Sequence, residues 1–279
     1  MNSIDKIISS ILEEGDEPKK YNVLFIPRRV GRRVKDRSEW VKRVLQQEHI
    51  EGDLDLSNLP ITDLGNLKSV TGHLDLRYTS ITNLKPLKSV GGSLNLYGTS
   101  ITNLGSLKSV GGYLNLWSTP IISLGSLESV GGDLDLSNTP ITNLGSLESV
   151  DGDLDLSDAS ITSLGSLKSV GGSLDLHGTH ITDLGSLESV YGNLELHGTP
   201  IVSLGSLKHI GGYLDLSDTP ITSLGSLESV GNNLYLLRTP ITNLGSLRSV
   251  SEIFISRNSK LDIDNLPEHL KNKIFIKPR

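Results

Sequence analysis

The stretch GGDLDLSNTPITNLGSLESV, residues 131–150, recurs in ten variants between Glu51 and Val250. Each variant has 20 residues and none carries an insertion, so the copies start at 51, 71, 91 and so on up to 231. We number the positions within each copy from 1 to 20. A fixed period of this length predicts a repeat solenoid, in which each copy packs only against its neighbours.

Six apolar columns run through the array. Positions 4, 6, 14 and 17 are always Leu, position 11 is always Ile, and position 20 is Val except at Ile210. Leu-x-Leu predicts a short strand with both leucines on one face, and the next copy can stack its strand in parallel about 4.8 Å away. The columns therefore predict one continuous core.

Polar and glycine columns predict the turns. Position 13 is always Asp, Asn or Ser, which are residues that cap helix starts, so the Leu-Gly-Ser-Leu that follows is expected to form one 3₁₀ turn. Position 2 is Gly in nine copies and Asn232 in the tenth. These two residue types tolerate the left-handed backbone region best, so we expect a positive φ just before each strand.

The pattern Leu-x-x-Leu-x-x-Val-x-Gly-x-Leu-x-Leu-x-x-Thr-x-Ile resembles the leucine-rich repeat family, in the short 20-residue form found in bacteria and tailed phages. The resemblance implies a curved, right-handed coil with one parallel β-sheet on the concave face and short 3₁₀ or turn segments on the convex face. One column departs from the family. Its buried Asn is Thr here in eight copies, and we expect the Thr hydroxyl to bond the neighbouring coil.

The ends differ from the array and divide the chain into four parts. Residues 1–20 form an amphipathic helix and a linker, and residues 21–50 an N-terminal cap. The cap combines a strand at 21–26 with a helix near 37–48, started by a capping box of Asp36 and Glu39. Residues 51–250 are the ten repeats. Residues 251–279 are a degenerate repeat and C-terminal cap, in which Ile253 and Ile255 replace the Leu pair one residue early.

Composition narrows the function classes. The chain has no Cys, so it has no disulfide, thiolate metal site or Cys nucleophile. No stretch of about 18 apolar residues predicts a membrane span, and no secretion signal is recognised. We therefore expect a cytoplasmic protein, or one in the host cytoplasm if it is phage-encoded.

Charge is divided unevenly along the chain. The net charge of −6 is the sum of +3 in residues 1–50, −11 in 51–250 and +2 in 251–279. An acidic array disfavours a phosphate backbone as its partner, so nucleic acid is not expected to bind the repeats.

The outward positions of each strand are 3, 5 and 7, with 8 beside them, and in this family that face is the binding side. Position 5 carries five successive acids from Asp135 to Asp215. Such a ladder either receives a basic protein surface or consists of solvated carboxylates inherited by duplication. It lacks the dense loop of oxygens that Ca²⁺ needs.

Aromatic and His side chains share this face. Tyr and Trp cluster near the N-terminal third and recur near Tyr213, either as binding anchors or as incidental surface residues. His177 and His197 occupy position 7 of adjacent copies. They form either a pH-sensitive contact, a two-His metal site or a solvated pair, and we expect no metal. The predicted partner-binding residues are Tyr97, Tyr113, Trp117, Asp133, Asp135, Asp153, Asp155, Asp175, His177, Glu195, His197, Tyr213 and Asp215.

The basic run before the array is the second candidate site. It is either a solvated basic face or a contact for an anion, RNA or an acidic protein. Its candidate anion contacts are Arg28, Arg29, Arg32 and Arg33.

No Ser-His-Asp set, Cys-His pair or phosphate-binding Gly loop is recognised, so we expect no enzyme and no cofactor. The sequence instead predicts a monomeric, non-catalytic scaffold that binds a protein partner with a basic surface. The family resemblance implies that this scaffold is a bacterial or phage-encoded protein that modulates host proteins. The alternatives are a structural or surface array, including an ice-binding one built on the Thr columns at positions 9 and 12, or anion or RNA contact through the basic segment.

Overall fold

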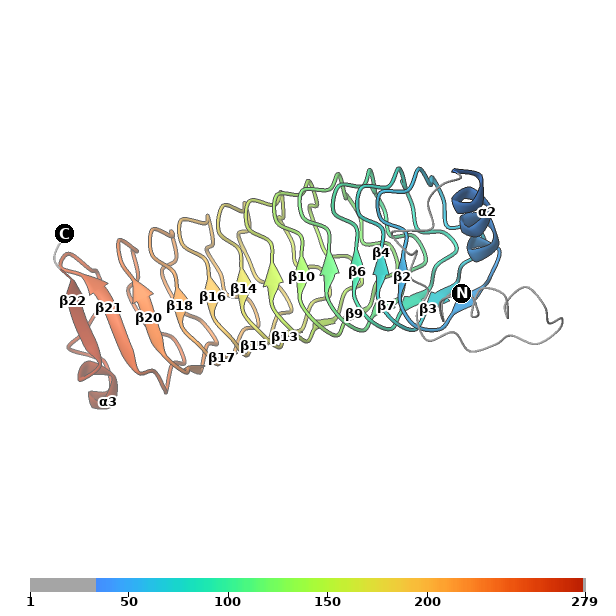
Figure 1. Cartoon of the computed structure of the whole chain (residues 1–279). Coiled ribbons are helices and arrows are strands. Elements are labelled where there is room, and N and C mark those ends of the chain that lie inside the picture. The colour runs from blue at the N-terminus through green and yellow to red at the C-terminus, as the bar shows by residue number, and fades with distance from the viewer. Residues whose placement is uncertain (1–33, 278–279) are drawn as a thin grey trace.

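The computed structural model describes residues 34–277, with side chains from residue 39 onward. Successive 20-residue coils stack side by side along one axis, with helix α2 over one end and α3 and β22 at the other (Figure 1). The predicted repeat solenoid is confirmed. Its coils form two parallel sheets, which we call the long sheet and the second sheet.

The long sheet is built from positions 4 and 5 and extends into the C-terminal residues. Its twelve strands, in spatial order, are β2 (Leu54–Asp55), β4 (Leu74–Asp75), β6 (Leu94–Asn95), β8 (Leu114–Asn115), β10 (Leu134–Asp135), β12 (Leu154–Asp155), β14 (Leu174–Asp175), β16 (Leu194–Glu195), β18 (Leu214–Asp215), β20 (Asn233–Leu236), β21 (Glu252–Ser256) and β22 (Ile274–Lys277).

The second sheet differs from the sequence prediction, which gave only one sheet. Positions 19 and 20 pair with the same positions of the next coil, and the Val or Ile at position 20 points into the core. Its ten strands are β1 (His49–Ile50), β3 (Ser69–Val70), β5 (Ser89–Val90), β7 (Ser109–Val110), β9 (Ser129–Val130), β11 (Ser149–Val150), β13 (Ser169–Val170), β15 (Ser189–Val190), β17 (His209–Ile210) and β19 (Ser229–Val230). The signal for it was present as a β-branched residue at position 20, which favours extended backbone.

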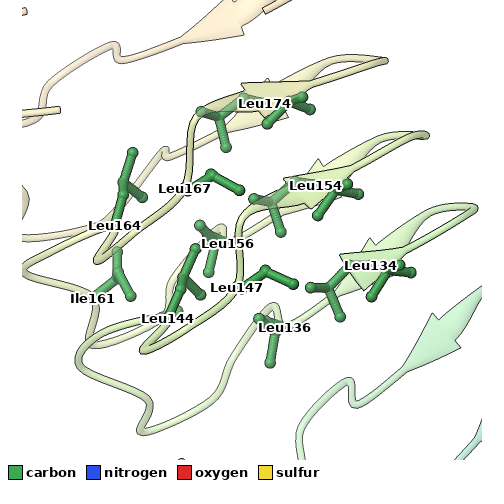
Figure 2. Packing of buried hydrophobic residues seen from close by; sticks show 14 of the residues in the cluster. Leu134, Leu136, Leu144, Leu147, Leu154, Leu156, Ile161, Leu164, Leu167 and Leu174 are labelled. Carbon is green, nitrogen blue, oxygen red and sulfur yellow. The ribbon is translucent and has the colours of Figure 1, made fainter. Parts of the chain in front are cut away.

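The six apolar columns form one core along the whole coil, as predicted. Leucines of successive coils, such as Leu134, Leu154 and Leu174, repeat one above the other (Figure 2). Each is at most 1% exposed. Because a coil covers the apolar side chains of its neighbour, burial depends on stacking, which is the basis of solenoid stability.

The turn after position 13 differs from the expected 3₁₀ turn. Leu147 N–H donates to Leu144 O at 3.2 Å, but Gly145 between them has a φ of 61°, whereas a 3₁₀ turn needs negative φ at every residue. The capping function of position 13 is confirmed: Gly145 N–H donates to Asn143 Oδ1 at 2.9 Å, and the equivalent bond forms in all ten copies. The turn therefore depends on Gly at position 15, with Lys85 as the one exception.

Position 2 was expected to have a positive φ, and this is wrong for every copy except the one at Gly52. The glycine is needed for space. A Cβ added at Gly132 would lie 2.8 Å from the carbonyl carbon of Gly112 and 2.9 Å from the nitrogen of Tyr113. The positive φ lies instead at position 8 in all ten copies, and it includes the non-glycine residues Tyr78 and Arg238.

The Thr column at position 9 is buried, but it does not bond the neighbouring coil as expected. Thr139 Oγ1 donates to Leu136 O of its own coil at 2.6 Å, and seven other copies repeat this contact. The hydroxyl thus closes the turn after each strand. Because this column is buried, only one of the two Thr columns, the one at position 12, is exposed.

Helix α2 (Val34–Leu45) covers the first coil. Val41 and Val44 are buried against the core, and Asn66 N–H donates to Leu45 O at 2.7 Å. The helix already includes Asp36, so the predicted capping box does not start it. The predicted helix in residues 1–20 and the strand at 21–26 lie outside the described residues. Within 34–277, the structure has no helix of the length and apolar character that a membrane span requires.

The C-terminal residues follow the predicted register. Ile253 and Ile255 pair with Leu234 and Leu236, so β21 enters the long sheet one residue early. Helix α3 (Glu268–Lys271) then leads into β22, which pairs with β21.

The close approach at position 2 predicts the effect of Gly132→Ala. The new Cβ would contact the backbone of the preceding coil, which cannot move without breaking its own hydrogen bonds, so we expect a loss of about 1–3 kcal/mol in the free energy of unfolding. Urea denaturation followed by circular dichroism measures it. Ser146→Ala, at an exposed position of the same coil, should change stability by less than about 0.5 kcal/mol. Equal stability of the two variants would contradict the steric explanation.

Candidate functional site

The outward side chains of the long sheet form a single surface, which we call the long-sheet face. Ser137 Oγ donates to Asp135 Oδ1 at 2.6 Å, and Tyr113 Oη donates to Asp135 Oδ2 at 3.2 Å, while Leu134 and Leu136 are buried. Positions 3, 5 and 7 therefore share one side of the sheet, opposite the core, as the sequence predicts.

The five acids of position 5 lie in register on neighbouring strands, and we call them the acidic ladder. Its members are Asp135, Asp155, Asp175, Glu195 and Asp215. All five side chains are half-buried. Parallel strands are about 4.8 Å apart, so each carboxylate lies next to another of the same charge and repels it by about 1 kcal/mol in water.

The position-5 side chains also shape the backbone, which sequence reasoning missed. Asp155 Oδ1 accepts the N–H of Ser157 at 2.9 Å and its hydroxyl at 2.6 Å, which closes the turn at the end of β12. Asn95 and Asn115 accept the same N–H from Tyr97 and Trp117, at 3.1 and 3.0 Å. A neutral amide therefore makes the turn as well as a carboxylate does. The turn explains a short polar side chain here, and it leaves the negative charge unexplained.

Asp133 and Asp153, at position 3 beside the acidic ladder, connect neighbouring coils. Each accepts, through Oδ1, the N–H of position 3 in the next coil: Asp153 N at 2.9 Å and Ser173 N at 2.6 Å. Both side chains remain exposed, so their charge adds to the same region of the face.

Two tyrosines hold members of the ladder from adjacent coils. Tyr113 donates to Asp135, and burial, together with the charge of Asp135, raises the pKa of Tyr113 above its usual value. Tyr213 donates to Glu195, and this hydrogen bond, with a contribution from burial, raises the pKa of Tyr213 to about 12. Both phenols are therefore protonated donors at neutral pH and fix the orientation of the carboxylates they contact.

Three aromatic rings stack before the ladder, and we call Tyr78, Tyr97 and Trp117 the N-terminal aromatic ladder. Tyr97 and Trp117 are stacked with ring centroids 5.0 Å apart, and the rings of Tyr78 and Tyr97 form a T-shaped pair with centroids 5.2 Å apart. Trp117 is 42% and Tyr78 55% exposed. Tyr97 and Trp117 of the predicted cluster are thus brought together with Tyr78, and their rings present apolar surface to solvent. Tyr113, which was predicted in the same cluster, is not part of this stack.

A second aromatic group lies at the far end of the face, and we call it the C-terminal aromatic ladder. Its members are Tyr213, Tyr235, Phe254 and Phe275, with successive centroids 6.1, 5.0 and 5.6 Å apart. Sequence reasoning missed the two phenylalanines. The early Ile pair that shifts the register at Ile253 also places Phe254 opposite Tyr235, and this signal was available. Lys277 Nζ lies 4.6 Å from the centre of the Phe254 ring.

His177 and His197 are stacked with ring centroids 6.1 Å apart. His197 Nδ1 lies 3.6 Å from Asp218 Oδ2, and Arg238 binds the same carboxylate and lowers the pKa of Asp218. Among residues 34–277, no group of three or more His, Asp or Glu side chains is placed to hold a metal ion. The pair therefore belongs to a small charged cluster at the edge of the long-sheet face.

The candidate anion contacts Arg28, Arg29, Arg32 and Arg33 lie outside the described residues. A shallow groove of about 390 Å³ runs over the second sheet between Ser69 and Asp151, lined by the small residues of positions 19 and 1. It is formed by different positions of the coil from the long-sheet face.

Comparisons with known proteins give a match among solved structures. No protein-family model and no curated protein sequence matches the chain. Among solved structures, the crystal structure of the LRIM1/APL1C complex matches with 15% identity and a TM-score of 0.40, over 83% of this chain and 55% of that chain. The chain thus spans about half the length of that chain. The repeat columns and the two parallel sheets described above establish a solenoid of 20-residue coils.

The double role of position 5 predicts a difference between two substitutions of Asp155. Asp155→Ala removes the acceptor for the N–H and hydroxyl of Ser157 and should cost about 0.5–2 kcal/mol of stability, as loss of a cap does. Asp155→Asn keeps the acceptor and removes a repulsive charge, so its stability should equal or exceed that of the original chain. Urea unfolding at pH 7 measures both. A loss on Asp155→Asn as large as on Asp155→Ala would show that the charge itself supports the fold.

The contact between Tyr213 and Glu195 predicts the ionisation of that phenol. Absorbance at 295 nm, compared with a Tyr213→Phe control, should show Tyr213 ionising near pH 12, and Glu195→Gln should bring it back toward 10. Because the folded state keeps this proton where the unfolded state loses it, the contribution to stability is present below pH 10 and falls as pH rises through 12. Ionisation near pH 10 in the unsubstituted chain would contradict the contact.

Proposed function

We propose that this leucine-rich-repeat solenoid is a non-catalytic scaffold that binds a protein partner with a basic surface through the long-sheet face. The observation that carries the proposal is the acidic ladder. Coils with Asn at position 5 make the same turn, so local structure does not require five consecutive negative charges. Charges held 4.8 Å apart in a fixed array disfavour the free protein and attract a cationic surface.

The aromatic side chains support binding of a protein surface. Rigid Tyr and Trp rings supply contact area with little loss of conformational freedom, and they are enriched among residues that dominate binding energies. The rings lie on the same face as the acids, so one partner can contact both. We further propose that the chain is a bacterial or phage-encoded modulator that acts in the cytoplasm as a monomer; the 20-residue form of the repeat motivates this.

The test uses charge removal that leaves the turns intact. The triple variant Asp135→Asn, Asp155→Asn, Asp175→Asn should weaken capture of partners from a cell lysate by about tenfold, because exposed ion pairs contribute up to about 1 kcal/mol each. Quantitative affinity capture with mass spectrometry measures the loss. The matched control is Asp63→Asn, Asp183→Asn, Glu188→Gln, which removes three charges outside the long-sheet face. Retention of every partner by the ladder variant would remove the proposed role of the acids.

A further inference from the structure

The two aromatic ladders lie at opposite ends of the acidic ladder. In the order of the long sheet, β6 and β8 carry Tyr97 and Trp117 next to their ends, β10 to β18 carry the acids, and β20 to β22 carry Tyr235, Phe254 and Phe275. This composite surface runs across the strands, along the axis of the coil. A partner that uses all of it must be long, cationic in the middle and apolar at both ends.

The sheet order gives the length of this surface. From β8 to β20 there are six strand spacings, β8-β10-β12-β14-β16-β18-β20, which is about 29 Å at about 4.8 Å each. An α-helix rises about 1.5 Å per residue, so about 20 residues of helix cover this distance.

The spacing of the acids selects a helix over an extended chain. A helix presents one side chain of a given face per turn, that is about every 5.4 Å, while the carboxylates of the acidic ladder lie about 4.8 Å apart. Over the four spacings of the ladder, the helix side chains therefore move only about 2 Å out of line with the carboxylates. An extended chain repeats a face every two residues, about 6.6–6.8 Å, and leaves register after two strands. A helix with one Lys or Arg per turn therefore matches all five acids.

Small side chains leave room for such a helix. At position 7, Ser137 and Ser157 follow Trp117, and both hydroxyls turn down to bond the ladder carboxylates at 2.6 Å. The exposed ring of Trp117 therefore stands next to a low stretch of the face with carboxylates along it. This places an apolar contact beside the first ionic contacts.

We propose that the long-sheet face binds a basic amphipathic helix of about 20 residues, which lies along the coil axis with its cationic side on the acidic ladder and an apolar residue at each end on an aromatic ladder. The proposal rests on the proposed function and specifies its partner. Charge complementarity identifies the middle of the helix. Trp117 is exposed at one end, whereas at the other end Tyr235 is half-buried and Phe275 is exposed, and these rings identify the anchors.

The experiment measures binding of a fluorescent 20-residue helical peptide to the full chain by polarisation at pH 8. The peptide carries Lys at one position per turn on one side, and a Leu pair near each end. We expect it to bind at least tenfold tighter than either 10-residue half, and at least tenfold tighter than a peptide of the same composition with Lys distributed around the helix. Equal binding of the distributed peptide or of one half would overturn the proposal.

Protein variants test the two anchors with residues that other coils already contain. Trp117→Ser and Tyr235→Asn should each weaken the 20-residue peptide about tenfold, while Ile122→Thr, which changes an exposed apolar residue off the face, should leave it unchanged. Unfolding midpoints of the three variants show that each is folded. If neither anchor variant weakens binding, the two-ended geometry is wrong.

The chain itself contains one competing occupant. Residues 18–33 carry six basic and no acidic side chains around the apolar run 23–26, and they lie outside the described residues. Changing Arg28, Arg29, Arg32 and Arg33 to Ser should leave peptide affinity unchanged. A tenfold gain would show that this segment occupies the face and would overturn a separate helical partner. Loss of lysate partners in the triple Asn variant, with no binding of the peptide, would refute the helix alone and leave the proposed function standing.

Discussion

Backbone hydrogen bonds between neighbouring coils determine where every side chain of the long-sheet face lies. Leu134 and Leu136 donate their N–H groups to the carbonyls of Asp153 and Asp155, at 2.8 and 2.9 Å, and the same pair of bonds recurs from coil to coil. Any side chain at position 5 is therefore placed directly beside its counterpart, whatever its chemistry. This constraint requires close approach, and it explains why position 2 is nearly always Gly and why the core columns allow only Leu, Ile and Val.

The fold was largely predictable because its determinants repeat ten times. The apolar columns, the capping residues of position 13 and the register shift at Ile253 were read correctly. The errors concern features that a column of residue types does not separate. Gly at position 2 and Gly at position 15 look alike in a sequence, yet one is needed for space beside Gly112 and the other for a positive φ. The second sheet was missed because a two-residue Ser-Val strand has no alternation to detect.

The sequence predicted most of the residues on the long-sheet face, but it did not predict the contacts between their side chains. The sequence places Tyr97 and Trp117 in one column, which predicts their proximity, and the structure shows them stacked at 5.0 Å. It did not indicate that Tyr113 and Tyr213 donate to acids of neighbouring coils, because those contacts depend on side-chain rotamers. Phe254 and Phe275 joined the face only once the pairing of β21 and β22 was known.

Comparison of the same position in different copies distinguishes what a side chain contributes to the fold from what it offers for binding. A single Asp at a strand end would be assigned to its turn, and the assignment would end there. Asn95 and Asn115 occupy the same place and form the same bond, so the turn accounts for one oxygen and the charge needs another cause. The same comparison applies at position 7, where Ser137 shows that the coil closes without the ring of Trp117. Where ten copies share one backbone, the side-chain atoms that differ between copies at no cost to the coil are those available for binding.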